Sequence, residues 1–531
     1  MINMRLIKIA FLLILPSLVL GQSGQSGDDY FKVKNYKDAL KKYLIEYNKK
    51  KEDHELNRKI AECYLFSNID KKKALPYLEF LAKQTKVEPQ TWYDLGLAYH
   101  LNMQFDKAIE AYEKYKAKAH GKELEKVTRQ IECCIYGKEL VKNPLDVTFE
   151  NLGKDVNTEY ADYYPFIPAD ESYVAFTSRR KAPSARLEYD GLYSSDIYIA
   201  EVKGGVWQKA KSAGVSINTV DDEECVGLTH DGHSMLIYID HQTAYGDIYI
   251  SHKDHNKPFG KTEPFSLNIN SKYIETSASI NMEENTVVFA SDRPGGFGGL
   301  DIYISHILPD GTWGPPINLG SHINTKYDED FPQLSDDGNE LHFCSKGHQG
   351  MGGEDIFVTH WNKEKKDWDN PINMGYPINT PDDDMHYAQS ASGHEAYISA
   401  VRPEGFGDLD IYRIILNRTE ARVTALVGNV FYGDSLHPAT DEFMVSIINK
   451  DTGEPLEGEF KYTPTKKKFV AALLPGHYIL EFDIPGFDKL KEEVTIMDKS
   501  DFKPFIKKKF YVKKPGQPTP QPTKPGTSVK K

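Results

Sequence analysis

The sequence predicts a multidomain fold: an α-helical repeat solenoid, a β-propeller, a small β-sandwich and a disordered tail. Three observations support this prediction. Residues 28–143 are rich in Lys, Glu, Ala, Leu and Tyr at helical spacing. Residues 145–416 repeat a short aromatic phrase between turns rich in Gly, Asp and Pro. Residues 421–512 contain short β-branched runs without that repeat.

The charge and cysteine content exclude several classes of protein. The chain of 531 residues has 65 Lys and Arg against 78 Asp and Glu, a net charge of -13, which disfavours nucleic acid as a partner. Its 5 cysteines are odd in number and widely scattered, so we expect buried thiols rather than a disulfide framework.

Residues 1–21 have the pattern of a secretory signal peptide. Arg5 and Lys8 precede an apolar run at 9–20 that ends in small residues. This run is too short for a transmembrane helix, and no later segment approaches about 20 uninterrupted apolar residues. Gln22 occupies the position where a lipoprotein needs its lipid-accepting Cys. We therefore expect an exported protein that reaches a membrane only through partners.

Residues 22–143 are expected to form the helical domain. The residues of a tetratricopeptide repeat occur at their usual spacing in Trp92, Leu95, Gly96, Tyr99, Phe105, Ala108, Tyr112 and Tyr115. Small Gly96 and Ala108 allow two antiparallel helices to approach closely. Two weaker copies precede this one, and residues 123–140 are expected to cap the stack. The pattern predicts an α-helical tetratricopeptide solenoid of about three repeats.

The concave face of this solenoid is the first candidate binding surface. Solenoids commonly bind peptides through the inward positions of the first helix of each repeat. Those positions hold Arg58, Glu62, Tyr93, Leu97 and His100. The alternative is an ordinary solvated helix face.

Residues 145–416 are expected to form a five-bladed propeller. The tripeptide DIY or DIF recurs every 51 to 55 residues, at Asp196, Asp247, Asp301, Asp355 and Asp410. This interval suits one four-stranded blade. A second phrase recurs in the same register, centred on Asn157, Asn218, Asn270, Asn324 and Asn379. The segment at 147–153 matches the outer-strand phrase of a blade, so we expect it to close the fifth blade.

Two segments follow the propeller. Residues 421–512 have short strands separated by turn residues, which predicts a small β-sandwich. Residues 513–531 have the Pro, Thr and Lys content of a disordered tail.

Several phrases resemble those of known families. SDRPGGFGGLDIY, at 291–303, resembles the TolB-type WD-like propeller repeat of bacterial envelope proteins. VTALVGNVF, DTGEPLEGEF and LLPGHYILEFDIPGF resemble the carboxypeptidase regulatory-like domain, which implies a transthyretin-like sandwich without catalytic residues. The order of signal peptide, helical repeats, propeller and sandwich is similar to that of PorE-type periplasmic proteins associated with the type IX secretion system.

This resemblance implies a location and a class of partner. It implies a periplasmic protein that is associated with the outer membrane through envelope proteins of a secretion or gliding complex. PorE-type proteins usually continue into an OmpA-like peptidoglycan-binding domain, which does not follow Lys531 in this sequence. Direct binding to peptidoglycan is therefore doubtful.

The sequence offers little for catalysis. The acidic runs at 221–224, 328–330 and 382–384 are similar to the carboxylates of five-bladed glycosidases, but they recur in register. A catalytic pair is normally unique, so we favour solvated loops or turn caps. No EF-hand, zinc-ligand or serine-hydrolase spacing is present. We therefore expect no catalytic residues, no metal and no cofactor.

The propeller loops provide the second candidate binding surface. Arg179, Arg293, Lys346 and Arg402 lie at comparable places in the blades and could present cations to a partner. The alternative is that they form ion pairs within their blades. The leading functional prediction is a non-enzymatic periplasmic scaffold or adaptor. The alternative is a glycan-binding propeller, with a glycosidase as its catalytic extreme.

Overall fold

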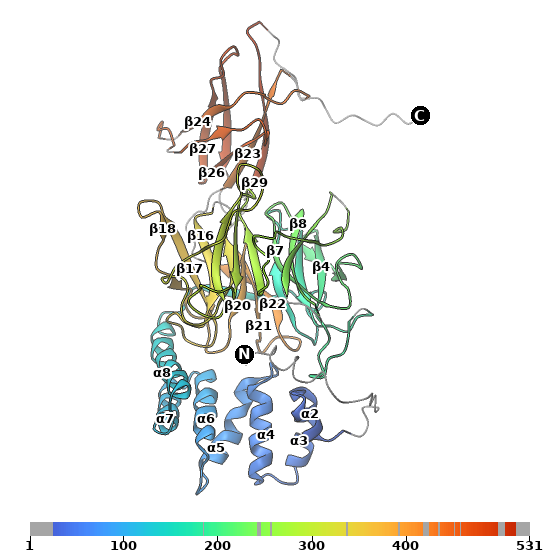
Figure 1. Ribbon diagram of the computed structural model, residues 1–531, viewed down its shortest axis with the longest axis vertical. Coiled ribbons are helices and arrows are strands. Elements are labelled where there is room, and N and C mark those ends of the chain that lie inside the picture. Colours follow the sequence, from blue (N-terminus) through green and yellow to red (C-terminus); the bar gives the residue numbers. More distant parts are fainter. Residues whose placement is uncertain are drawn as a thin grey trace.

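The computed structural model describes three layers that follow one another along the longest axis (Figure 1). Helices lie at one end, the propeller in the middle and the sandwich at the other end. The described residues are 25–183, 185–241, 246–254, 257–335, 338–390, 393–417, 424–433, 436–450, 452–456, 458–496 and 505–516. The expected signal peptide at 1–21 and most of the expected tail at 513–531 lie outside them. None of the described helices is long and apolar enough to cross a membrane.

The helical layer is built from antiparallel neighbours. Side chains of Ser26, Asn35 and Asp53 cap the first three helices, because their oxygens accept from otherwise unpaired backbone N–H groups. Gly96 lies against the ring of Tyr112, where a larger residue would collide. The elements are α2 (Gly27–Lys32), α3 (Tyr36–Tyr47), α4 (His54–Leu65), η1 (Lys71–Ala74), α5 (Leu75–Ala82), α6 (Pro89–Leu101), α7 (Phe105–Lys116) and α8 (Lys122–Leu140).

The predicted fold class is wrong in its helical part. The described chain is mostly β-structure, and its seven described α-helices, of 6 to 19 residues, form one short layer rather than a tetratricopeptide solenoid. The repeat pattern correctly indicates that two helices pack closely, as Gly96 does on Tyr112. A solenoid additionally needs a stack of such helix pairs that buries its own apolar faces. Here the propeller covers part of the layer, since Met351 is buried among residues of α7 and α8.

Further polar contacts hold the helical layer to the propeller. His100 Nε2 lies 2.8 Å from the carbonyl oxygen of Met351. Lys71 forms an ion pair with Asp382, and Glu125 forms one with Lys326. These contacts involve the loops that precede the first strand of a blade or join its second and third strands. The helical layer therefore rests on the face where the inner strands begin.

The central region contains five antiparallel sheets, which are the blades. The sheet orders are β2-β3-β4-β5 with β6 beside β4, β10-β9-β8-β7, β11-β12-β13-β14, β15-β16-β17-β18 with β19 beside β17, and β1-β22-β21-β20. Their bounds are β1 (Val147–Asn151), β2 (Asp162–Phe166), β3 (Tyr173–Ser178), β4 (Asp196–Lys203), β5 (Val206–Trp207), β6 (Lys211–Ser212), β7 (Asp222–Leu228), β8 (Ser234–Asp240), β9 (Asp247–His252), β10 (Glu263–Pro264), β11 (Glu275–Ile280), β12 (Thr286–Ser291), β13 (Asp301–His306), β14 (Ile317–Asn318), β15 (Glu329–Leu334), β16 (Glu340–Ser345), β17 (Asp355–Asn362), β18 (Asp367–Trp368), β19 (Ile372–Asn373), β20 (Met385–Gln389), β21 (Glu395–Ala400) and β22 (Asp410–Leu416).

The blades close into a ring. The inner strands β2, β7, β11, β15 and β20 contact one another in that order, and β20 contacts β2 again. The early strand β1 pairs with β22, from Val147 opposite Leu416 to Asn151 opposite Tyr412. The segment at 147–153 thus completes the last blade, as the sequence predicted.

The two repeated phrases are bonded to each other in every blade. Asn218 accepts a hydrogen bond from Ile197 N and donates one to Ile197 O, both at 2.9 Å. The same pair of bonds joins Asn157 to Ile411, Asn270 to Ile248, Asn324 to Ile302 and Asn379 to Ile356. These side chains satisfy buried backbone groups, so the repeated Asn residues are structural.

The third region has two packed sheets. Their orders are β26-β23-β29 and β25-β24-β27-β28, and β29 runs parallel to β23. Phe469, Phe482 and Phe510 meet in the core between them. The strands are β23 (Thr424–Tyr432), β24 (Phe443–Asn449), β25 (Lys461–Tyr462), β26 (Phe469–Leu473), β27 (Gly476–Phe482), β28 (Leu490–Ile496) and β29 (Phe505–Val512).

The pairing of β1 with β22 makes closure of the ring testable. We expect deletion of residues 145–152 to lower the melting temperature of the propeller strongly, because the last blade loses its outer strand and several backbone hydrogen bonds worth about 1 kcal/mol each. Thermal denaturation followed by circular dichroism measures this change. Thr148→Ala, at an exposed position of the same strand, is the control and should change the melting temperature little. An unchanged melting temperature in the deletion variant would show that β1 does not hold the ring closed.

Candidate functional site at the propeller axis

Each inner strand begins with a carboxylate that has a structural task. Its oxygen accepts a hydrogen bond from the backbone N–H four residues earlier, at N···O distances of 2.5 to 2.9 Å. These carboxylates are Asp162, Glu223, Glu275, Glu329 and Asp384, and all are buried. Three of the five come from the acidic runs of the sequence, where they cap turns. A residue that repeats in this way is needed by every blade and marks no single site.

The next position along the inner strands differs between the blades. It holds Tyr163, Glu224, Thr276, Asp330 and Met385. The Tyr163 hydroxyl donates to Glu224 across the first two blades at 2.8 Å. The Thr276 hydroxyl donates to Asp330 across the third and fourth blades, also at 2.8 Å. Because the fold does not require one residue type here, these side chains are candidates for a function.

Aromatic rings meet one residue further along. Tyr164 and Phe331 come from the first and fourth blades, which are not neighbours, yet their ring centroids lie 5.1 Å apart. His386, from the fifth blade, lies 3.9 Å from Tyr164 and 4.6 Å from Phe331. Side chains from opposite sides of the ring can meet only at its axis. We define the axial site as Tyr163, Tyr164, Glu224, Asp330, Phe331 and His386.

Burial sets the charge of the axial site. It raises the pKa of Glu224 to about 7, although the hydrogen bond from Tyr163 opposes this shift. It also raises the pKa of Asp330, and it lowers the pKa of His386 to about 3. At neutral pH the imidazole is therefore uncharged, and Glu224 exchanges between its acid and carboxylate forms. Glu224 and Tyr163 remain half-buried rather than fully buried.

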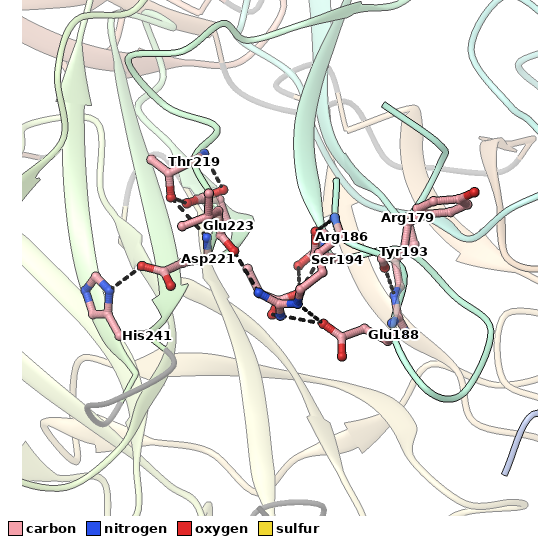
Figure 2. Close-up of polar contacts among 12 residues, drawn as sticks. Arg179, Arg186, Glu188, Tyr193, Ser194, Thr219, Asp221, Glu223 and His241 are labelled. Carbon is pink, nitrogen blue, oxygen red and sulfur yellow. Dashed lines mark hydrogen bonds and ion pairs between the residues drawn. The ribbon is translucent and has the colours of Figure 1, made fainter. Parts of the chain in front are cut away.

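Two of the predicted propeller cations lie beside the axial carboxyl groups. Arg179 Nε donates to Tyr193 O at 2.6 Å (Figure 2). The positive charge of Arg179 favours the ionised form of Glu224. Lys346 lies 2.8 Å from Asp328 and 3.3 Å from Glu354, and its charge favours the ionised form of Asp330. Burial raises the pKa of Glu354 to about 7 despite the nearby Lys346. These two cations therefore partly balance the negative charge around the axis.

The other two predicted cations lie inside their blades. Arg293 forms an ion pair with buried Glu275 at 2.9 Å, and Arg402 lies 3.4 Å from the ring centroid of Phe149. The residue that corresponds to Arg293 in the first blade is Arg180 rather than Arg179, since Arg180 pairs with Asp162 in the same way. A Ser two residues earlier, which bonds the arginine in both blades, is the sequence signal for this register.

The five residues predicted to line the helical groove differ in their exposure and in their contacts. Arg58 is half-exposed and forms ion pairs with Glu55 and Glu62, and Leu97 packs on the helical core. Tyr93 is buried beside other tyrosines, and His100 is fully buried against the propeller. Burial lowers the pKa of His100 to about 4, so it is neutral. Binding of a partner by these five residues stays a prediction.

A polar network holds the loops between the first two blades. Arg186 contacts Glu188 and the carbonyl oxygen of Val220, and its backbone N–H donates to Ser194 (Figure 2). Asp221 lies 2.8 Å from Nδ1 of His241. This network orders the loops next to Glu224. The described residues contain no group of three or more His, Cys, Asp or Glu that could hold a metal ion.

Comparisons with known proteins support the propeller and little beyond it. No protein-family model matches the chain, and no curated protein matches it in sequence. Similar solved structures include TolB from Acinetobacter baumannii, 14% identical over 49% of this chain and 56% of that one, with a TM-score of 0.30. An endo-arabinase from Bacteroides thetaiotaomicron is 15% identical over 49% and 95%, with a TM-score of 0.32. An α-L-arabinofuranosidase from Podospora anserina is 10% identical over 52% and 95%, with a TM-score of 0.33.

These comparisons correct two expectations. The similar structures are propellers, which agrees with the absence of a tetratricopeptide solenoid from the described residues. The expectation that the protein is not an enzyme is also wrong as it stands, because arabinofuranosidases, a glycosyl hydrolase and gluconolactonases are among the similar structures. TM-scores this low assign no activity to this chain. No comparison supports a relation to PorE-type proteins or type IX secretion.

The raised pKa of Glu224 predicts a pH dependence of stability. A carboxyl group whose pKa rises from 4.5 to about 7 on folding stabilises the fold below pH 4.5 and loses this contribution as the pH rises through 7. The loss amounts to roughly 3 kcal/mol. Glu224→Gln should therefore gain stability relative to the natural protein between pH 4.5 and pH 8. Urea unfolding across this range measures the change, with Glu110→Gln, at an exposed position of α7, as the control. A pH-independent difference would contradict the shift.

Proposed function

We propose that the propeller binds carbohydrate at the axial site. The observation that carries this proposal is the departure from the blade repeat at one level of the ring. There, Tyr163 donates to Glu224 beside the rings that meet at the axis, and Asp330 directly precedes one of these rings in its strand. The repeated carboxylates are required by the fold, whereas the residue after them is not and can serve recognition.

The chemistry of these groups suits a sugar. Carboxylate oxygens accept from hydroxyl groups, while a phenol and a protonated carboxyl group donate to them. Glu224 can do both near pH 7, because its pKa is about 7. The partly exposed ring of Phe331 supplies apolar surface for the C–H side of a sugar ring. The loops ordered by Arg186 and Asp221 would fix the approach beside Glu224.

Hydrolysis is the catalytic extension of the same site. A glycosidase needs one carboxyl group as general acid and a second as base or nucleophile. A pKa near 7 suits Glu224 to the first role. Asp330 is the second axial carboxyl group and would take the other role through its Oδ2, because its Oδ1 accepts from Thr276, Ser277 and the backbone N–H of Phe331. The binding experiment therefore also measures the release of reducing sugar.

The proposal predicts a binding defect in variants of the axial carboxyl groups. The purified protein should bind at least one polysaccharide from a panel of arabinan, xylan, α-glucan, β-glucan, chitin and peptidoglycan glycan strands. Glu224→Gln and Asp330→Asn should weaken that binding about tenfold or more, since a hydrogen bond to a charged group contributes about 1.5–3 kcal/mol. Isothermal titration calorimetry measures the affinity.

Two results would contradict the carbohydrate proposal. The first is the absence of binding to every polysaccharide of the panel by folded protein. The second is equal affinity in the natural protein and both variants. Glu110→Gln, in the helical layer, serves as the matched control and should bind like the natural protein.

A second candidate is an adaptor among envelope proteins in the periplasm. It is favoured by the succession of a helical layer, a propeller and a sandwich in one chain, which matches the order seen in the PorE-type resemblance. The helical residues Arg58 and Glu62 and the propeller residues Arg179 and Lys346 would then face partners. This role does not require the protein to lack catalysis.

The adaptor role predicts stable protein partners. Mild cross-linking of native envelopes, followed by purification of the tagged protein and mass spectrometry, should recover outer-membrane secretion or gliding proteins in stoichiometric amounts. A chain truncated after residue 416 serves as a control for contacts made through the sandwich. Reproducible recovery of the protein alone would rule out the adaptor role and leave the carbohydrate proposal standing.

A further inference from the structure

The axis of the propeller is closed directly beyond the axial carboxyl groups. Tyr164, Phe331 and His386 come from three different blades, and all three ring pairs lie within 5.1 Å between centroids. Tyr164 and His386 are each only 7% exposed. Their rings therefore fill the axis at this level rather than line an open channel.

The backbone is shaped to bring these rings together. Tyr164, Phe331 and His386 have φ values of 55°, 54° and 63°, in the left-handed region that non-glycine residues rarely adopt. Each lies in a register shift between the first two strands of its blade. The bulge turns the side chain out of the sheet and toward the axis. The equivalent residues of the second and third blades, Cys225 and Ser277, are small, so three rings suffice.

Glu224 lies on the helix-facing side of these rings. It comes one position before the level of Tyr164, Phe331 and His386, about 3.3 Å along the strand, whereas Asp330 Oδ1 accepts a hydrogen bond from Ser277 of that level. The inner strands begin at the face on which the helical layer rests, because Lys326 and Asp382 in the preceding loops contact it. A ligand that reaches Glu224 therefore has the rings directly beyond it.

We infer that the axial site recognises the end of a saccharide chain, and that Tyr164, Phe331 and His386 are the residues that impose this specificity. An internal segment would have to continue past the carboxyl groups along the axis, and the three rings occupy that path. A terminal sugar unit can instead stop against them. This inference rests on the proposed carbohydrate function and adds the part of the chain that is bound.

The low pKa of His386, about 3, agrees with this role, since burial keeps the imidazole uncharged beside the two aromatic rings. An uncharged ring packs on Tyr164 and Phe331 without the cost of burying a cation. Ser399 Oγ lies 3.3 Å from Nδ1 of His386, and this contact fixes the orientation of the ring.

The test compares long and short chains of one polysaccharide. The probe is the polysaccharide that binds most tightly in the panel above, before and after partial acid hydrolysis to chains about ten times shorter. If chain ends are bound, the shortened sample should half-saturate the protein at an about tenfold lower mass concentration, because it contains about ten times more ends per gram. If internal segments are bound, the two samples are equally potent by mass.

Equal potency by mass would overturn the chain-end inference while leaving carbohydrate binding intact. Failure of every polysaccharide to bind would instead remove the proposed function. In a second measurement, Phe331→Ala opens the closed level and should bring the potency ratio down toward one, whereas Phe331→Tyr should keep it. If Phe331→Ala does not fold, the ratio measured with the natural protein still decides between chain ends and internal segments.

Discussion

The structure depends on one recurring interaction, the double hydrogen bond between an Asn side chain and the backbone of an Ile in the third strand of the preceding sheet. In each blade it joins the loop that precedes the inner strand to the third strand of the preceding sheet. The carboxylate at the start of the inner strand then caps the same loop. Together these bonds fix where each inner strand begins. The five inner strands consequently present equivalent positions at equal depth, which is what makes an axial level of side chains possible.

The sequence predicted the periodic part of the propeller because those bonds recur in every blade. Asp301 and Asn324 could be placed in one register from their spacing alone, and the match of 147–153 to an outer strand predicted the closing pair of β1 and β22. The axial rings could not be found in this way. Tyr164, Phe331 and His386 are residues of three different types. Their rings meet because of β-bulges, for which the sequence contains no recognisable pattern. The sequence signal for the axial site is the position after each repeated carboxylate, where the residue type differs from blade to blade.

The helical region shows why a local pattern does not determine an assembly. The tetratricopeptide spacing correctly indicates that Gly96 must accommodate an aromatic ring from the next helix. The spacing cannot predict that a propeller loop places Met351 among the helices, because that contact joins residues more than 200 positions apart. For the same reason His100, expected in an open groove, is buried. Long-range contacts of this kind replaced the expected solenoid with a layer that rests on the propeller.

Each acidic run contains a structural carboxylate, and in two of the runs an axial carboxyl group follows it directly. Within 221–224, Glu223 caps a turn as its counterparts do in every blade, whereas Glu224 contacts Tyr163 and has no counterpart in the fifth blade, where Met385 stands. Recurrence in register argued against catalysis only for the first of these residues. Adjacent residues on a strand point to opposite sides, so a structural carboxylate and a functional one can follow each other directly. The axial site lies one residue away from the motif that holds the ring together.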